Sequence, residues 1–219
     1  MFDIEAYRKY EQYFETEKTE SFELLSGKGK LIVSAPHSVE QTRNGSKKFS
    51  EPQTGVIAKM LHDELGIPVI YKTKNCGDDA NYDAVSPYKD ALVEYIKENK
   101  TEFMLDLHQL SPKRDVMIDI GTGKYKNVKD PAIVEVAYRI FEKYDLGRIE
   151  IDTPFDASYP YTLSSYIARN CNISCLQLEL NSKLVRTDSS SSKEEKVFSS
   201  LVELIDAIER TLSQNYEKE

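Results

Sequence analysis

The sequence predicts an α/β fold, a three-layer sandwich in which helices flank a mostly parallel or mixed central sheet. Short hydrophobic runs alternate along most of the chain with longer segments of helical periodicity, the pattern typical of such sheets. Glycine and proline mark many of the boundaries between these segments. The 219 residues, of which 40% are hydrophobic and 30% charged, suit one domain over residues 1–219 with a sizeable core.

Helices are predicted where apolar residues recur every three or four positions and a start or stop signal lies nearby. Pro52 and Pro87 fall in the first turns of two helices, and Gly66 follows the end of one. In chain order, helices are expected at 4–16, 51–65, 87–99, 131–145, 163–170 and 193–215.

Strands are predicted at the short apolar or alternating runs between these helices. They are expected at 22–25, 31–33, 68–71, 103–107, 114–120, 149–151 and 174–180. The glycine-containing turn at 26–29 predicts a hairpin between the first two strands. Loops are expected at 41–50, which contains Asn44-Gly45, at 75–83, at 153–161 and at the serine-rich run 188–192.

Composition excludes several classes of function. The net charge is -8 and the basic residues are scattered, so no nucleic-acid partner is expected. No apolar run approaches the roughly 20 residues of a membrane span, and the first residues lack the apolar segment of a secretory signal. The 3 cysteines have no metal-type pairing and indicate free thiols in a reducing cytoplasm. The oligomeric state does not follow from the sequence.

The first candidate site follows the buried strand at 31–33, where His37 precedes Glu40 by three positions. Ligands of α/β proteins bind beyond the carboxyl ends of the strands. An imidazole and a carboxylate at this spacing can converge on one small cation. Because His-x-x-Glu also arises by chance, the alternative is a strand-end histidine beside a solvated glutamate.

A second histidine, His108, ends another hydrophobic strand and shares a face with Asp106. With His37 and Glu40 it supplies two nitrogens and one carboxylate, a set that binds catalytic zinc and leaves a position open for water. Because Mg²⁺ and Ca²⁺ prefer oxygen ligands, this ligand set favours zinc over them. Asp106 could orient a ligating His108. The alternative is a strand-end histidine with a structural role, while His62, on the polar side of a helix, is expected at the surface.

Glu179 lies in the strand Leu-Gln-Leu-Glu-Leu-Asn, where alternation places it with Gln177 and Asn181, opposite the leucines. A carboxylate in such a strand is costly unless it is paired or faces a site. Glu179 is therefore a candidate general base, which would take a proton from water and pass it to a leaving nitrogen. The alternative is the solvent-facing side of an edge strand.

Three segments, taken in order, resemble the N-formylglutamate amidohydrolase family. They are Ala-Pro-His-Ser-Val-Glu at 35–40, Asp-Leu-His-Gln at 106–109 and Leu-Gln-Leu-Glu-Leu-Asn at 176–181. The likeness covers roughly residues 31–181 and includes Asp-Ala-Asn-Tyr-Asp at 79–83. It implies a phosphorylase/hydrolase-like sandwich, related to the zinc metallocarboxypeptidases and aspartoacylases.

The resemblance also implies roles for individual residues. His37, Glu40 and His108 match the zinc ligands, Glu179 matches the general base, and Asn81 matches an asparagine that helps to hold a substrate carboxylate. Apart from the resemblance, Glu51 is a candidate to replace Glu40 as a ligand if Glu40 points away. The implied reaction is zinc-dependent hydrolysis of an N-acyl amino acid such as N-formylglutamate. A carboxypeptidase-like zinc peptidase and a non-catalytic binding protein are the alternatives.

The chain departs from the family pattern at Tyr82, which stands where the relatives have an arginine. A substrate carboxylate would need another cation, and Arg43, Arg114 and Arg169 are the candidates. The run Gly121-Thr122-Gly123-Lys124 lacks the full spacing of a phosphate-binding loop and is predicted to be a turn.

Overall fold

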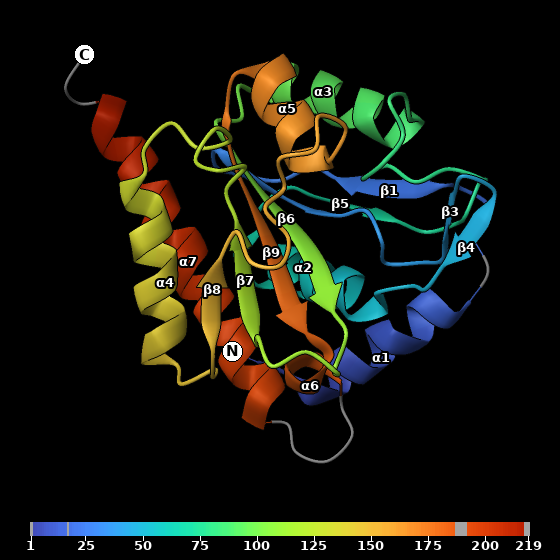
Figure 1. Ribbon diagram of the computed structural model, residues 1–219, viewed down its shortest axis with the longest axis horizontal. Helices are drawn as coiled ribbons and strands as arrows, with labels where there is room; N and C mark the ends of the chain where they lie inside the picture. Colours follow the sequence, from blue (N-terminus) through green and yellow to red (C-terminus); the bar gives the residue numbers. More distant parts are fainter. Residues whose placement is uncertain (1, 17, 187–191, 217–219) are drawn as a thin grey trace.

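A seven-stranded mixed sheet forms the centre of the computed structural model, which describes residues 2–16, 18–186 and 192–216 (Figure 1). Across the sheet the strands follow the order β1-β5-β2-β6-β9-β7-β8. Their bounds are β1 Phe22–Leu25, β2 Leu31–Ala35, β5 Val69–Lys72, β6 Phe103–Leu110, β7 Ile118–Gly121, β8 Ile149–Ile151 and β9 Ser174–Asn181. Strands β5, β2, β6 and β9 are parallel, whereas β1 pairs antiparallel with β5 and β7 pairs antiparallel with β9.

Helices cover both faces of this sheet, so the predicted three-layer α/β class is confirmed (Figure 1). On one side lie α1 Ile4–Glu15, α2 Pro52–Leu65, α4 Ala132–Lys143, α6 Ser182–Val185 and α7 Ser192–Tyr216, over the larger hydrophobic core. On the other side, α3 Pro87–Asn99 and α5 Leu163–Cys171 enclose a smaller core. In the described residues, none of the helices has the length and apolar character needed to cross a membrane.

Local capping explains several helix boundaries. The Asp3 carboxylate accepts hydrogen bonds from the first backbone N–H groups of α1, and the Ser86 hydroxyl accepts one from the N–H of Tyr88 in α3. Gly66 ends α2 with a φ of 67°, a conformation that costs glycine little.

Two local predictions are corrected by the pairing of the strands. The hairpin expected around 26–29 is wrong, because β1 pairs with β5 and leaves β2 between β5 and β6. All five β2 residues are buried, so both edges of this strand need partners inside the sheet. The expected strand at 114–120 begins only at Ile118.

The expected loop at 41–50 contains a small hairpin of β3 Gln41–Arg43 and β4 Ser46–Lys48. Its turn is Asn44-Gly45, where both residues have positive φ, as a tight hairpin turn requires. Of the expected serine-rich loop at 188–192, residues 188–191 lie outside the described part of the chain.

The parallel strands end together at one edge of the sheet. The register pairs Ser34 of β2 with Asp106 of β6, and His108 of β6 with Glu179 of β9. Side chains that follow β2 and end β6 and β9 therefore meet at this edge, although they are far apart along the chain.

Candidate active site

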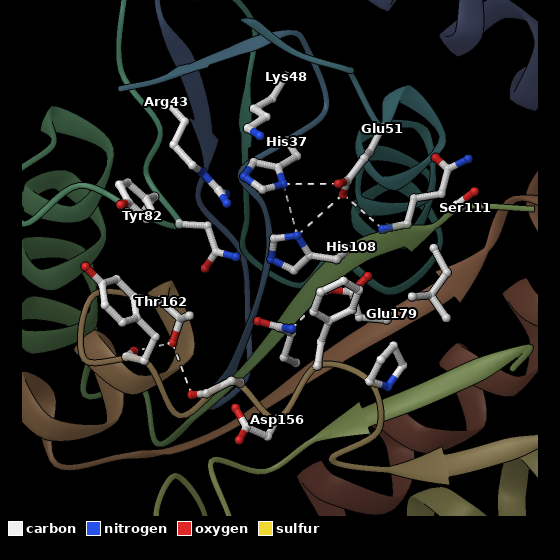
Figure 2. Close-up of a pocket in the computed structure, with 18 of the residues that line it drawn as sticks. His37, Arg43, Lys48, Glu51, Tyr82, His108, Ser111, Asp156, Thr162 and Glu179 are labelled. Atoms are coloured by element: carbon white, nitrogen blue, oxygen red, sulfur yellow. Dashed lines mark hydrogen bonds and ion pairs between the residues drawn. The ribbon is translucent and has the colours of Figure 1, made fainter. Parts of the chain in front are cut away.

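His37 and His108 meet at the carboxyl ends of β2 and β6. Their ring centroids are 4.7 Å apart, and their Nδ1 atoms are 3.2 Å apart (Figure 2). Both residues are buried. The contact follows from the parallel pairing of the two strands, which brings their ends side by side.

The carboxylate that joins the histidines is that of Glu51. Its Oε1 lies 3.1 Å from Nδ1 of His37, and its Oε2 lies 3.4 Å from Nδ1 of His108 (Figure 2). The backbone N–H of Gln109 donates to Oε2 at 2.9 Å, and the backbone N–H of Glu51 donates to the His37 carbonyl at 2.8 Å. Glu51 immediately precedes Pro52, the first residue of α2, so the start of this helix fixes its position.

Glu40, the expected third ligand, lies outside this cluster, and the expectation is corrected. Its Oε1 is 3.0 Å from Nζ of Lys47 and accepts a weaker contact from Nδ2 of Asn75 at 3.4 Å. Its side chain is 43% exposed. The chain turns into the β3–β4 hairpin directly after Glu40, so this carboxylate pairs with a lysine of the hairpin rather than with the histidines.

Two buried aspartates contact the Nε2 atoms of the histidines, on the side of each ring away from Glu51. Nε2 of His37 lies 2.9 Å from Oδ1 of Asp79, and Nε2 of His108 lies 3.3 Å from Oδ2 of Asp106. A carboxylate on Nε2 accepts its proton and leaves the Nδ1 lone pair directed into the site. Both imidazoles are thus oriented in the manner of metal-ligating histidines.

The electrostatics of the cluster favour positive charge between these groups. Burial by itself lowers the pKa of His37, but Glu51 and Asp79 outweigh it and raise the pKa to about 9. The pKa of His108 is likewise raised well above its usual value, because Asp106 and Glu51 outweigh burial. Against burial, the two histidines lower the pKa of Glu51 to about 2. A divalent cation could replace the protons that this site attracts.

The residues present fit a zinc ion. The ligand atoms of His37, Glu51 and His108 all lie within 4.8 Å of one another. The two Nδ1 atoms are 3.2 Å apart, and each lies 3.1 or 3.4 Å from a different oxygen of the Glu51 carboxylate. These distances are close to the roughly 3.4 Å between ligand atoms of tetrahedral zinc with bonds of ~2.0–2.1 Å. Two imidazoles with one carboxylate also leave a fourth position for water, as catalytic zinc sites do.

Glu179 lies next to this cluster on a central strand (Figure 2). Because β9 runs between β6 and β7 and Glu179 is only 7% exposed, the edge-strand alternative is wrong. Nε2 of Gln177 donates to its carboxyl group at 3.1 Å. Burial raises the pKa of Glu179 to about 8, opposed by His108 and reinforced by Glu51. Such a carboxyl group can both accept and donate a proton near neutral pH.

An open cavity of about 550 Å³ lies over these residues and includes three of the candidates for substrate binding, Asn81, Arg43 and Arg114. Oδ1 of Asn81 accepts a hydrogen bond from the N–H of Leu163 at 2.6 Å, which fixes its amide. The Arg114 guanidinium stacks over the Phe155 ring at 5.1 Å.

Arg43 brings a guanidinium next to Tyr82. Its Nε donates to Oδ2 of Asp79 at 2.8 Å, and its guanidinium lies 4.7 Å from the ring centroid of Tyr82. Arg169 differs, because its Nη2 donates to the Pro160 carbonyl at 3.0 Å and it is not among the described residues that line the cavity.

Two further residues lie outside the site. His62 is partly buried, and its Nδ1 lies 2.8 Å from the Ile67 carbonyl oxygen. It therefore connects the last turn of α2 to the segment that follows the helix. Thr122, in the glycine-containing run at 121–124, donates to the Asp152 carboxylate at 2.7 Å, and Gly123 there has a positive φ of 66°. Both findings agree with structural roles.

Comparison of the sequence with protein-family models and with curated proteins finds no match. Solved structures do match. N-formylglutamate amidohydrolase from Ralstonia eutropha JMP134 superposes with a TM-score of 0.59 at 13% identity, over 87% of this chain and 98% of that chain. A bacteriophage poly-γ-glutamate hydrolase gives 0.57 at 13% identity over 94% of each chain. A gene product of Agrobacterium tumefaciens superposes with a TM-score of 0.57 at 10% identity, over 87% of this chain and 97% of that chain.

The fold and the site therefore define a three-layer α/β sandwich with a buried histidine–glutamate–histidine cluster at its strand ends. More particularly, the fold is that of N-formylglutamate amidohydrolase and its structural neighbours, which confirms the resemblance seen in the sequence segments at the level of fold.

Proposed function

We propose that this protein is a zinc-dependent amidohydrolase that acts on N-acyl amino acids. The observation that carries the proposal is the convergence of His37, Glu51 and His108, with Glu179 beside them, at the carboxyl ends of parallel strands. Two of the structural neighbours are named as hydrolases of glutamate compounds, N-formylglutamate and poly-γ-glutamate, which supports this class of substrate.

His37, Glu51 and His108 would hold the zinc through two Nδ1 atoms and one carboxylate. When bound, zinc supplies a Lewis acid that polarises a carbonyl and lowers the pKa of a neighbouring water toward ~7. Asp79 and Asp106 keep the two imidazoles in the tautomer that this requires, because each occupies an Nε2.

Glu179 would move the protons of the reaction. Its carboxylate takes a proton from the attacking water, and the resulting carboxylic acid gives that proton to the departing nitrogen. Burial and the pKa of about 8 suit the second step, while the charge of a bound divalent cation would favour the ionised form needed for the first. The N–H donated by Gln177 orients the carboxyl group for both.

Arg43, Asn81 and Arg114 would bind the carboxylate of the amino acid and the oxyanion of the transition state. All three line the cavity beside the cluster. A guanidinium matches a carboxylate through two parallel hydrogen bonds, and donors aimed at developing charge stabilise the transition state. Arg43 is the leading candidate, because Asp79 fixes its position close to His37.

A zinc peptidase is the second candidate function, and one observation favours it. A second cavity of about 470 Å³ shares Phe49, Glu51, Gln109, Leu110 and Ser111 with the first. A substrate longer than a single N-acyl amino acid could extend past Glu51 into this space. Hydrolysis of peptides but not of N-acyl amino acids would select this alternative.

The test is metal analysis combined with release of amine from a panel of N-acyl amino acids and short peptides. About one equivalent of zinc per chain and amine release that is lost in Glu179→Gln are expected. A protein that binds no zinc, or that binds zinc but hydrolyses no amide of either kind, contradicts the proposal. The second result would instead favour a binding protein on this scaffold.

A further inference from the structure

Exposed apolar side chains gather at the mouth of the candidate active site. Six large apolar side chains are exposed among the described residues. Three of them line the 550 Å³ cavity, namely Phe49, Phe155 and Tyr159. Exposed apolar groups that cluster around a cavity are typical of a ligand-binding surface, whereas scattered ones carry no such meaning.

Phe49 is the most exposed of these, with 98% of its surface accessible. It lies between β4 and α2, two positions before Glu51, and lines both cavities. A phenylalanine in this position contributes little to the folded core. Covering its ring with an apolar part of a ligand would remove it from water, which is favourable.

Phe155 is held in place by its surroundings, although 42% of its surface is accessible. Its backbone N–H donates to Oδ2 of the buried Asp119 at 2.7 Å. Its carbonyl oxygen would lie 2.9 Å from a Cβ at Gly121, so only glycine fits beneath it. The Arg114 guanidinium lies over the ring. The cavity therefore offers a preformed aromatic surface next to a cation.

The tyrosines add a second aromatic surface. The rings of Tyr82 and Tyr159 stack at 5.6 Å with an interplanar angle of 19°, and the Arg43 guanidinium lies over Tyr82. Both aromatic surfaces thus carry an arginine. A ligand with an apolar group and a carboxylate would match this combination, whereas a ligand that is polar throughout would leave the aromatic rings exposed.

We propose that the preferred substrate carries a bulky apolar group next to the hydrolysed amide, and that Phe49 and Phe155 determine this specificity by contacting that group. The inference rests on the proposed function and names its substrate class. The apolar group could belong to the acyl part or to the amino-acid side chain, because both lie next to the amide.

The test compares kcat/KM for N-formylglutamate, N-benzoylglutamate and N-formylphenylalanine in the wild type, Phe49→Ala and Val85→Ala. Val85 is a matched control, because it is 77% exposed and is not among the described residues lining the cavity. The wild type is expected to prefer at least one of the two apolar substrates about tenfold or more over N-formylglutamate, and the preferred substrate shows which side of the amide carries the apolar group.

Phe49→Ala is expected to lower kcat/KM about tenfold for the apolar substrate alone, and Val85→Ala to leave all three values unchanged. No preference in the wild type, or an equal loss for every substrate in Phe49→Ala, overturns the inference while amide hydrolysis itself stands.

A binding measurement separates this inference from the proposed function. Zinc-loaded Glu179→Gln is titrated with N-benzoylphenylalanine in a calorimeter, and so is the double variant that also carries Phe49→Ala. The dissociation constant of the double variant should be about tenfold higher. This result supports the apolar specificity even if no substrate is hydrolysed. An unchanged dissociation constant, or no binding at all, contradicts it.

Discussion

The floor and the rim of the cavity are built in different ways. The floor consists of His37, Glu51, His108 and Glu179, buried or nearly so at strand ends and at the start of a helix, and each is held by a polar partner. The rim consists of exposed aromatic side chains on the connecting segments, such as Phe49 and Phe155. The floor suits metal binding and proton transfer, because these need side chains in fixed positions. The rim suits the recognition of substrate, because residues on surface loops can differ between related proteins without disturbing the core.

The two regions also differ in their charges. On the floor, unlike charges shift each other's protonation, as the pKa of about 9 for His37 and of about 2 for Glu51 shows. On the rim, arginines stack on aromatic rings instead. We therefore expect substitutions on the floor to affect metal binding or the chemical step for every substrate. Substitutions on the rim should change the choice of substrate.

The largest effect is expected from Glu179→Gln. Loss of a group that transfers protons in the transition state typically lowers kcat by about 10²–10⁴-fold. Because glutamine keeps the size of the side chain and Glu179 is outside the ligand set, the zinc content should not change. Steady-state kinetics and metal analysis on the same sample test this. Glu135→Gln, an exposed change on α4, is the control and should behave as the wild type.

The next largest effect is on zinc affinity, and it distinguishes between the two glutamates that the sequence suggests as the third ligand. Glu51→Gln should weaken zinc binding at least about a hundredfold, since it removes a charged ligand from a buried site. Glu40→Gln should leave binding unchanged, because that carboxylate pairs with Lys47. Competition with a chelator of known affinity measures both. Equal weakening in the two variants would show that the cluster is not the zinc site.

A smaller effect on zinc binding is expected from the two aspartates that contact Nε2 of the histidines. Asp79→Asn and Asp106→Asn should each weaken zinc binding about 10–100-fold, because the amide can no longer accept the Nε2 proton as a charged partner. The same competition assay applies. A variant with unchanged zinc affinity and unchanged kcat would mean that the aspartate has only a structural role.

The smallest effect concerns stability and pH. Burial raises the pKa of Asp119 to about 6, from the ordinary aspartate value near 4. The folded state therefore holds this proton more tightly, and the stabilisation present below pH ~4 is lost as pH rises through 6. The free energy of unfolding of the wild type, relative to Asp119→Asn, should fall by on the order of 2 kcal/mol over this range. Denaturant titrations at several pH values test it; a difference independent of pH contradicts it.

Sequence patterns could predict the sheet and the proximity of His37 and His108, because hydrophobic runs mark the strands whose ends meet. They could not separate Glu40 from Glu51. Spacing along the chain favoured Glu40, but the β3–β4 hairpin turns the chain so that the carboxylate at the start of α2 reaches the histidines. The signal for this was Asn44-Gly45, a hairpin turn whose consequence for Glu40 depends on tertiary contacts.

The pairing of β1 was likewise beyond local patterns. The turn at 26–29 is compatible with a hairpin, yet β2 is buried throughout and needs two parallel neighbours. The aromatic rim was also missed, because single exposed rings on loops leave no periodic signal. Phe49 would have been recognisable only from its position two residues before Glu51.

The most direct test of the account is the anomalous diffraction of a zinc-loaded crystal, measured on both sides of the zinc absorption edge. We predict one strong anomalous peak, bonded to Nδ1 of His37, Nδ1 of His108 and the carboxylate of Glu51, with the Glu179 carboxyl group beside it. A peak bonded to Glu40, or no peak between the two histidines, would contradict the account.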